Sequence, residues 1–359
     1  MLLKFHERQP IRESKSMQNN PAMNDPDRYY AACCQTDFPS PKSRDEIAVR
    51  VDRMLEMIDS AVLGYEPFFP VRLVVFPEFA HSPPVYFTVR ELLDRLAVPL
   101  PNEHTDRYVQ RARHHGVFIQ TGTFLERDDD YPDAVFNTTC LIGPTGILAK
   151  YRKTHPWIPW EVHASPHDLP GYTDDPFPVV DTELGRLGAA ICYDWLFPEA
   201  IRQLALKGAE VLIRVSAYMD PWGTAAPLDW WTLVNRCRAL ENMAYVVAAN
   251  QGARLGNYPP FSWPGGSMIV DFDGRILAQA EPGPGERIVV GPIDLAALRT
   301  ERERRRGHHM LAHLRTELYS GYSATIYPSA TATGNWPPTI EGNNRVIHEA
   351  KSRSPRASD

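Results

Sequence analysis

Residues 187–218 have the sequence LGAAICYDWLFPEAIRQLALKGAEVLIRVSAY, and this stretch decides the fold class. Its apolar start predicts a buried strand over residues 188–192, and an amphipathic helix is predicted over 198–209. A second apolar strand is predicted over 211–218. Strand, helix and strand in direct succession are typical of an α/β protein.

The same alternation continues in both directions along the chain. Strands are predicted at 29–37, 72–76, 117–126, 137–143, 146–151 and 244–250, and helices at 44–62, 103–115 and 228–243. Two hairpins, residues 138–151 and 265–279, share a layout in which two apolar strands flank a turn that contains glycine. This similarity indicates two related half-domains packed together.

Both ends of the chain differ from this central region. Residues 1–28 are polar and lack periodicity, and the last thirty or so residues are rich in turn formers and charge, so we expect tails or arms that wrap a partner. A helix is predicted from residue 294 to about 320. We therefore divide the chain into an N-terminal tail (1–28), a central α/β domain (29–295) and a C-terminal helix and extension (296–359) that contributes oligomer contacts.

Composition excludes several classes of protein. The net charge of −6 disfavours a nucleic-acid partner, and the ERERRR run at 301–306 is better explained as a solvated or interface face of its helix. No uncharged apolar run approaches the ~18 residues of a membrane helix, and the first fifteen residues turn charged before a signal sequence can form. We expect a cytoplasmic protein with no membrane partner.

The cysteines and prolines are informative in different ways. The five cysteines are odd in number and have no metal-ligand spacing, which argues against a disulfide framework and a zinc site.

The 33 prolines exceed the roughly 18 expected from average usage, and they gather at 67–101, 156–178 and 259–292 between predicted elements. This distribution favours loops of fixed shape over a disordered chain.

Three reactive side chains follow directly on predicted strands, where open sheets commonly build their sites. Glu78 follows the buried strand RLVVF and Pro77, and Lys153 follows GILAKYR at the start of the loop THPWIPWE. The neighbours Lys150 and Arg152 are interpreted as a solvated basic strand end. Cys192 lies at the elbow between strand and helix, where backbone amides lower a thiol pKa and stabilise an oxyanion.

The other cysteines, Cys33, Cys34, Cys140 and Cys237, are better explained as small packing residues. A thiol nucleophile needs a base and a cation. Histidine is the usual base, and a Cys/His pair through His155 or His163 is possible, but Glu78 and Lys153 have the better placement at strand ends.

These residues resemble the Glu-Lys-Cys signature of the nitrilase superfamily of carbon–nitrogen hydrolases. The resemblance rests on VFPE, KYRK and ICYDWLFPE in that order, and it covers roughly residues 30–295, including RALENMAYVVAANQG and the DFDGRIL hairpin. The loop KYRKTHPWIPWE is similar to that of aliphatic amidases and formamidases, in which a second glutamate lies eight residues after the lysine. Glu161 has that position here.

The resemblance implies a four-layer αββα sandwich that associates into homo-oligomers through its helices. It also implies that Glu78, Lys153, Cys192 and Glu161 are catalytic, that the backbone N–H of Tyr193 helps to bind the oxyanion, and that Tyr218 lies beside the pocket. No metal or organic cofactor is required. Tyr193 and Asp194 follow Cys192 where those amidases usually have an acidic residue immediately after the cysteine, which leaves the substrate open.

Five tryptophans lie in predicted loops at the rim of the site: Trp157, Trp160, Trp195, Trp222 and Trp263. Several aromatic side chains there indicate a tight apolar pocket, with Trp157 and Trp160 as substrate-binding residues. The sequence thus predicts an amidase for a small or medium uncharged primary amide, a small-molecule partner. The alternatives are a nitrilase, an N-carbamoyl amide hydrolase of the same superfamily, and an inactive member that acts as a binding protein.

Overall fold

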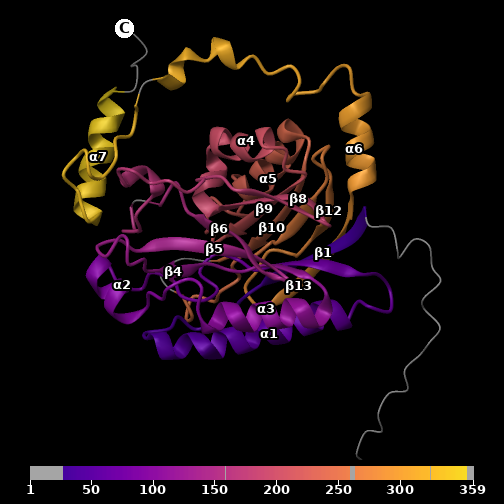
Figure 1. Ribbon diagram of the computed structural model, residues 1–359, viewed down its shortest axis with the longest axis horizontal. Coiled ribbons are helices and arrows are strands. Elements are labelled where there is room, and N and C mark those ends of the chain that lie inside the picture. Colours follow the sequence, from indigo (N-terminus) through magenta and orange to yellow (C-terminus); the bar gives the residue numbers. More distant parts are fainter. Residues whose placement is uncertain (1–26, 158, 259–262, 324, 354–359) are drawn as a thin grey trace, which may run out of the picture.

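A computed structural model of the chain describes residues 27–157, 159–258, 263–323 and 325–353. Two sheets lie face to face, and helices cover the outer face of each (Figure 1). The predicted N-terminal tail lies, for residues 1–26, outside the described residues. In the parts of the chain that are described, none of the helices has the length and apolar character needed to cross a membrane.

The first sheet has seven strands. In spatial order they are β13 (Arg287–Asp294), β1 (Arg28–Gln35), β2 (Val71–Val75), β3 (Phe118–Gln120), β5 (Phe136–Gly143) and β4 (Phe124–Glu126), with β6 (Gly146–Arg152) also paired to β5. Strands β1, β2 and β3 are mutually parallel, whereas β5 is antiparallel to β3 and forms a hairpin with β6.

The second sheet has six strands. Their spatial order is β12 (Ile276–Gln279), β11 (Met268–Val270), β10 (Tyr245–Asn250), β9 (Val211–Ser216), β8 (Gly185–Ile191) and β7 (Val179–Thr182). Strands β8, β9 and β10 are parallel, and β11 and β12 continue the sheet as an antiparallel hairpin. Each sheet therefore places three parallel strands beside an antiparallel hairpin, β5–β6 in the first and β11–β12 in the second, and this common topology agrees with the predicted pair of related half-domains.

Helices form the two outer layers. Helices α1 (Ile47–Leu63) and α3 (Glu103–His115) cover the first sheet, and α4 (Pro198–Leu206) and α5 (Trp230–Asn242) cover the second (Figure 1). Helix α1 buries Val51, Met54, Leu55 and Ile58, the one-face spacing of an amphipathic helix. With its two sheets and two helical layers the molecule has the predicted αββα architecture.

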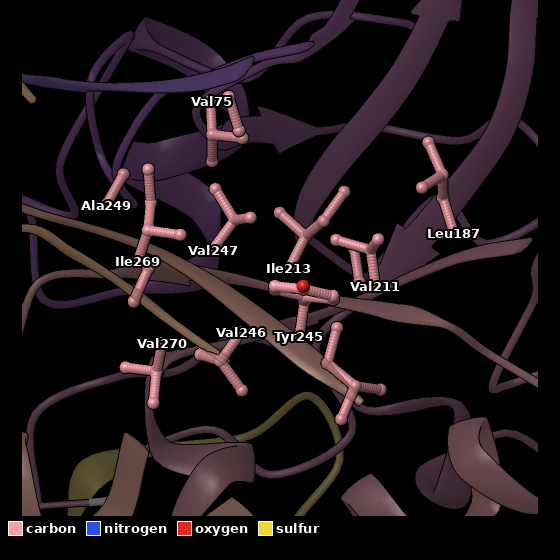
Figure 2. Close-up of a cluster of buried hydrophobic side chains, with 14 of the residues drawn as sticks. Val75, Leu187, Val211, Ile213, Tyr245, Val246, Val247, Ala249, Ile269 and Val270 are labelled. Carbon is pink, nitrogen blue, oxygen red and sulfur yellow. The ribbon is translucent and has the colours of Figure 1, made fainter. Parts of the chain in front are cut away.

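The main core lies between the two sheets. Figure 2 shows Val75 of β2 opposite Val247 of β10, with Ile213 of β9 beside it, and all three are fully buried. Strand β1 is buried on both faces, since Cys33 packs between the sheets and Cys34 packs under the helices. The ends of the central strands are thereby fixed in place, and the reactive side chains that follow them have a rigid base.

Three further α-helices and five 3-10 turns are present in the described residues. They are α2 (Val89–Arg95), α6 (Leu295–Arg304), α7 (Ile340–Arg353), and the 3-10 turns η2 (Arg44–Glu46), η3 (Pro166–Asp168), η4 (Cys192–Leu196), η5 (Thr316–Leu318) and η6 (Ser320–Ser323).

Three predictions about local structure are wrong. The strand predicted over 117–126 is broken into β3 and β4 because Gly122 packs against the chain near Pro77, where a Cβ atom would lie 2.5 Å from the Pro77 carbonyl oxygen. The helix predicted to about residue 320 ends at Arg304, shortly before Gly307, a residue that weakens helices. The C-terminal residues are not a simple tail, because α7 forms there and packs on its own chain.

Candidate active site

Glu78 lies three residues beyond the end of β2, and its side chain is 1% exposed. Its Oε1 accepts hydrogen bonds from Lys153 Nζ at 2.7 Å and from Asn137 Nδ2 at 2.8 Å. Its Oε2 accepts from the backbone N–H of Ala217 at 3.0 Å. Three donors from three different strand ends therefore hold the carboxylate in one orientation.

Lys153 directly follows β6, and its backbone N–H donates to the carbonyl of Asn137 on the partner strand β5. The buried ammonium donates to Glu78 and to both carboxylate oxygens of Glu161, each at 2.9 Å. Glu161 also accepts from the backbone N–H of Trp157, which closes the loop between these two residues. One cation is thus shared by two buried carboxylates.

Cys192 is the first residue after β8 and begins η4. Its φ of 43° lies in the left-handed region, as does the φ of 60° at Phe79, immediately after Glu78. Residues held in this unfavourable conformation are common at functional sites. The thiol donates to the carbonyl oxygen of Ala217 at 3.5 Å, and the backbone N–H of the same alanine donates to Glu78, so the two reactive side chains lie on either side of one residue.

The ionisation of the two glutamates differs. Burial raises the pKa of Glu78; Lys153 lowers it and the negative charge of Glu161 raises it, leaving it at about 7. Burial also raises the pKa of Glu161, but Lys153 and His163 outweigh this and lower that pKa to about 2. Burial disfavours a charged lysine, but Glu161 and Glu78 raise the pKa of Lys153 above its ordinary value. At neutral pH the site holds a fixed ion pair beside a carboxyl group that can exchange a proton.

The expectation of a lowered thiol pKa is wrong. Burial, followed by the charge of Glu78, raises the pKa of Cys192 well above its ordinary value. The α-helix on which that expectation depended begins only at Pro198, and a 3-10 turn separates it from the cysteine. The resting thiol is protonated, so attack by this sulfur requires a base, and Glu78 is the adjacent one.

Asp194 is a positioning residue, a role that the sequence pattern does not indicate. One carboxylate oxygen accepts from the backbone N–H of Ile191 at 3.0 Å and from the Tyr151 hydroxyl at 2.7 Å. The other accepts from Thr154 Oγ1 and from the backbone N–H of His155. Asp194 therefore ties the cysteine elbow to the chain on both sides of Lys153.

A cavity of about 220 Å³ opens beside Cys192. The four predicted pocket residues, Tyr193, Trp157, Tyr218 and Trp160, line it, and Glu161 lines it as well. The rest of the lining consists of apolar side chains: Phe79, Leu196, Ala217, Met219, Trp222, Trp230 and Trp263. Among the described residues of this lining, Glu161 has the one charged side chain, and its oxygens already accept hydrogen bonds from Lys153 and Trp157. The cavity is therefore apolar and aromatic.

Trp195 does not belong to the rim, although the sequence predicted it there. It is fully buried, and its Nε1 donates to the carbonyl oxygen of Ala190 at 3.1 Å. Trp230, at the start of α5, lines the cavity instead.

Both histidines of the alternative Cys/His pair lie against carboxylates. His155 Nδ1 lies 3.0 Å from Asp194 Oδ1, and His163 Nδ1 lies 3.4 Å from Glu161 Oε2. In the described residues no group of three or more histidine, cysteine, aspartate or glutamate side chains has the arrangement of a metal site.

The interpretation of Arg152 as solvated is also wrong. Arg152 is buried and makes two hydrogen bonds of 2.9 Å to Glu126, and its guanidinium lies 4.1 Å from the centre of the Phe136 ring. Lys150 donates to the same glutamate at 2.7 Å. Arg152 and its neighbour in sequence, Lys153, thus belong to two separate buried clusters of charged residues.

Comparisons with known proteins agree with this geometry. Residues 30–303 match the family model of the carbon-nitrogen hydrolases. A formamidase of Bacillus cereus (strain Q1) is 31% identical over 263 residues, which is 72% of this chain and 72% of the relative.

Among solved structures, Nit3 of Saccharomyces cerevisiae, a member of branch 10 of the nitrilase superfamily, is similar with a TM-score of 0.64 and 25% identity, over 78% of this chain and 95% of that one. An amidase from Nesterenkonia sp. shares the fold with a TM-score of 0.60 and 22% identity, over 82% and 96% of the two chains. The family match, the formamidase relatives and the fold together show that this chain belongs to the carbon-nitrogen hydrolase family, in the amidase and formamidase branch of the nitrilase superfamily, and hydrolyses carbon–nitrogen bonds.

Proposed function

We propose that the protein is a cysteine-dependent amidase that converts a small or medium uncharged primary amide into a carboxylic acid and ammonia. The observation that supports this most directly is the position of the Glu78 carboxylate, which shares Lys153 with Glu161 and accepts from the N–H of Ala217, the residue whose carbonyl oxygen accepts from the Cys192 thiol. A base with a pKa of about 7 beside a protonated thiol is suited to catalysis near neutral pH.

In the first step Glu78 takes the thiol proton while the sulfur of Cys192 attacks the amide carbonyl carbon. The carbonyl oxygen becomes an oxyanion, which the Lys153 ammonium and the backbone N–H of Tyr193 stabilise. Glu78 then donates its proton to the amide nitrogen, the carbon–nitrogen bond breaks, and ammonia leaves. A thioester remains on Cys192.

In the second step Glu78 takes a proton from water as the water oxygen attacks the thioester carbon. The carbon–sulfur bond breaks, the carboxylic acid leaves, and the proton returns to the sulfur. Amide and water are thus converted to acid and ammonia, with the enzyme unchanged. Glu161, ionised throughout, keeps Lys153 charged and orients the amide group of the substrate.

The cavity lining supports an uncharged acyl group. Among the described lining residues an acidic acyl group would meet no cation, and a basic one would meet the single carboxylate of Glu161, whose oxygens already accept hydrogen bonds. The aromatic walls favour apolar acyl groups, because burial of apolar surface drives their binding.

Ammonia release from a panel of primary amides, nitriles and N-carbamoyl compounds tests the proposed reaction. We expect release from amides. Turnover of nitriles alone would indicate a nitrilase that works through a thioimidate, turnover of N-carbamoyl compounds alone would indicate the third alternative, and no turnover at all would favour a binding role.

The nucleophile has its own test. Cys192→Ala should abolish ammonia release while changing the free energy of unfolding by no more than about 1 kcal/mol, because one sulfur atom is removed. His155→Ala is the control for the alternative pair and should remain active. An active Cys192→Ala variant together with an inactive His155→Ala variant would contradict the assignment.

The proposal extends to assembly and location. Leu233 and Leu240 of α5 and Leu206 of α4 expose apolar side chains on the outer helical layer, which supports a homo-oligomer formed through these helices. Light scattering of the full chain tests the assembly. A cytoplasmic location, without nucleic-acid or membrane partners, stays a prediction from composition.

A further inference from the structure

The C-terminal residues 325–353, here called the strap, lie beyond the end of the family match at residue 303. In Figure 1 the strap is the yellow segment that includes α7, and it lies beside the loop between β6 and β7. That loop contains Glu161. The contacts between the strap and the loop show what this added segment does.

The first contact is made by Asn343 of α7. Its Nδ2 donates to the backbone carbonyl oxygen of Glu161 at 3.2 Å, and the asparagine side chain is buried. The carboxylate of the same glutamate accepts two hydrogen bonds from Lys153. A single residue therefore separates the strap from the catalytic ammonium.

Asn343 is itself held by a second buried asparagine. Asn335 Nδ2 donates to Asn343 Oδ1 at 2.9 Å, and Asn335 Oδ1 accepts from the hydroxyl and the backbone N–H of Thr339. Gly342 leaves room for this arrangement, because a Cβ atom there would lie 1.7 Å from Asn335 Oδ1. The orientation of the Asn343 amide is fixed from within the strap.

A second group of contacts lies further along the loop, at Asp168. Its Oδ1 accepts from the backbone N–H of Ala330 at 2.7 Å, and its carbonyl oxygen accepts from the Thr331 hydroxyl at 3.0 Å. The other carboxylate oxygen accepts from the backbone N–H of Ser165 within the loop. Asp168 thus links the shape of the loop to the position of the strap.

Apolar packing reinforces the polar contacts. Ile340 packs against a buried cluster that includes Val162 of the loop, and Trp336 packs against one that includes Ala164 and Leu169. Val162 and Ala164 alternate with His163 just after Glu161. The part of the loop that follows Glu161 is therefore covered by strap residues.

We propose that residues 325–353 hold Glu161 in place against the Lys153 ammonium, and that Asn343 is the positioning residue through which the strap acts on catalysis. Without this contact the loop can move Glu161 away from Lys153. The ammonium would then be less well oriented for the oxyanion, and a displacement of about 1 Å in a catalytic group can reduce a rate a hundred-fold.

The same displacement changes the proton affinity of Glu78. The groups that face Glu78 are Lys153 after β6, Glu161 and Tyr258 from loops, Cys192 after β8 and Arg214 on β9. The charge of Glu161 raises the pKa of Glu78 and that of Lys153 lowers it. If Glu161 moves away, the pKa of Glu78 falls, and the acid limb of kcat/KM moves to lower pH.

The test compares Asn343→Ala with Asn344→Ala in the full chain. Asn344 is exposed and lies next to Asn343 on α7, so the chemical change is identical and only the contact differs. We expect Asn343→Ala to lower kcat/KM about ten- to a hundred-fold and to move its acid limb to lower pH. Asn344→Ala should match the wild type in both. Gly342→Ala, which displaces Asn335, is a second variant that should change both quantities in the same direction.

Two outcomes would overturn the inference. One is a lower melting temperature for Asn343→Ala with unchanged kcat/KM at temperatures where it is folded, which would make the strap purely structural. The other is a lower kcat/KM with an unmoved acid limb, which would mean that the effect does not pass through Glu161.

This kinetic test rests on the proposed amidase function. If the wild type hydrolyses no amide, that proposal fails by itself, and the pH dependence of Cys192 alkylation by iodoacetamide then replaces kcat/KM as the measurement. An alkylation profile that is the same in Asn343→Ala and Asn344→Ala would overturn the inference independently of turnover.

Discussion

Arg152 and Lys153 are neighbours in sequence, yet they belong to two buried ion clusters with opposite properties. Successive residues of an extended chain point to opposite sides, so the two cations enter different surroundings. The Arg152 cluster consists of Arg152, Lys150, Glu126 and Asp128. The Lys153 cluster consists of Lys153, Glu78 and Glu161.

The difference lies in the ratio of charges around each buried glutamate. Glu126 is 1% exposed and accepts hydrogen bonds from both Arg152 and Lys150, so this buried carboxylate has two cationic partners. Burial raises its pKa, but these partners outweigh that effect and the pKa is lowered. Glu78 shares a single cation with Glu161, and its pKa is raised to about 7. Two cations and two carboxylates keep Glu126 charged, whereas one cation between two carboxylates leaves one of them able to exchange a proton.

The largest effect that tests this comparison is on activity. Glu78→Gln should lower kcat/KM about 10³-fold, because the amide cannot take the thiol proton. The matched change Glu126→Gln should leave kcat/KM of the folded protein within a few-fold of wild type. The measurement is ammonia release at a temperature where both variants are folded. Equal losses of kcat/KM in the two variants would mean that the two clusters have the same role.

The next largest effect is on stability. In Arg152→Met the Glu126 carboxylate stays buried and keeps one cationic partner, Lys150. Removal of one partner from a buried ion pair lowers the free energy of unfolding by about 3–5 kcal/mol. Urea unfolding measures this loss. A variant with unchanged stability, or one that is folded but inactive, would contradict the view that this cluster is structural.

Much of the site could be predicted because each reactive residue follows a strand whose pattern is clear in the sequence. Glu78, Lys153 and Cys192 are brought together by the ends of β2, β6 and β8. Strands β2 and β8, which position Glu78 and Cys192, belong to parallel pairs with strongly apolar sequences, and β6, which positions Lys153, belongs to a hairpin. The family resemblance added Glu161, whose position depends on a loop with no regular pattern.

What could not be predicted depends on contacts between distant parts of the chain. The sequence KYRK does not tell which basic residue meets which acid, so Arg152 was misplaced at the surface. Asp194 and Asn343 are ordinary polar residues in sequence, and their roles come from partners about forty and 182 positions away, respectively. The raised pKa of Cys192 likewise results from burial by the assembled fold, which local sequence does not reveal.

The smallest of the expected effects concerns stability and pH. The pKa of Glu78 is raised from 4.5 to about 7 on folding, so the folded protein binds more protons than the unfolded chain between these values. Glu78 therefore makes the folded state progressively less stable as pH rises from about 4.5 to 7. Glu126 has the opposite sign, because its pKa is lowered: its stabilisation is present above its ordinary pKa and is lost as pH falls through the folded value.

Glu78→Gln isolates the first of these contributions. Above pH 7 the variant should be more stable than the wild type by about 1–3 kcal/mol, because one of two buried carboxylates that share Lys153 is gone. The difference should shrink towards pH 4.5, where the wild-type carboxyl group is protonated and resembles the amide. Urea unfolding across this pH range measures it. Glu126→Gln should instead be less stable than the wild type at neutral pH, and a pH-independent gain or a loss in Glu78→Gln would mean that the Lys153 ammonium already neutralises both carboxylates.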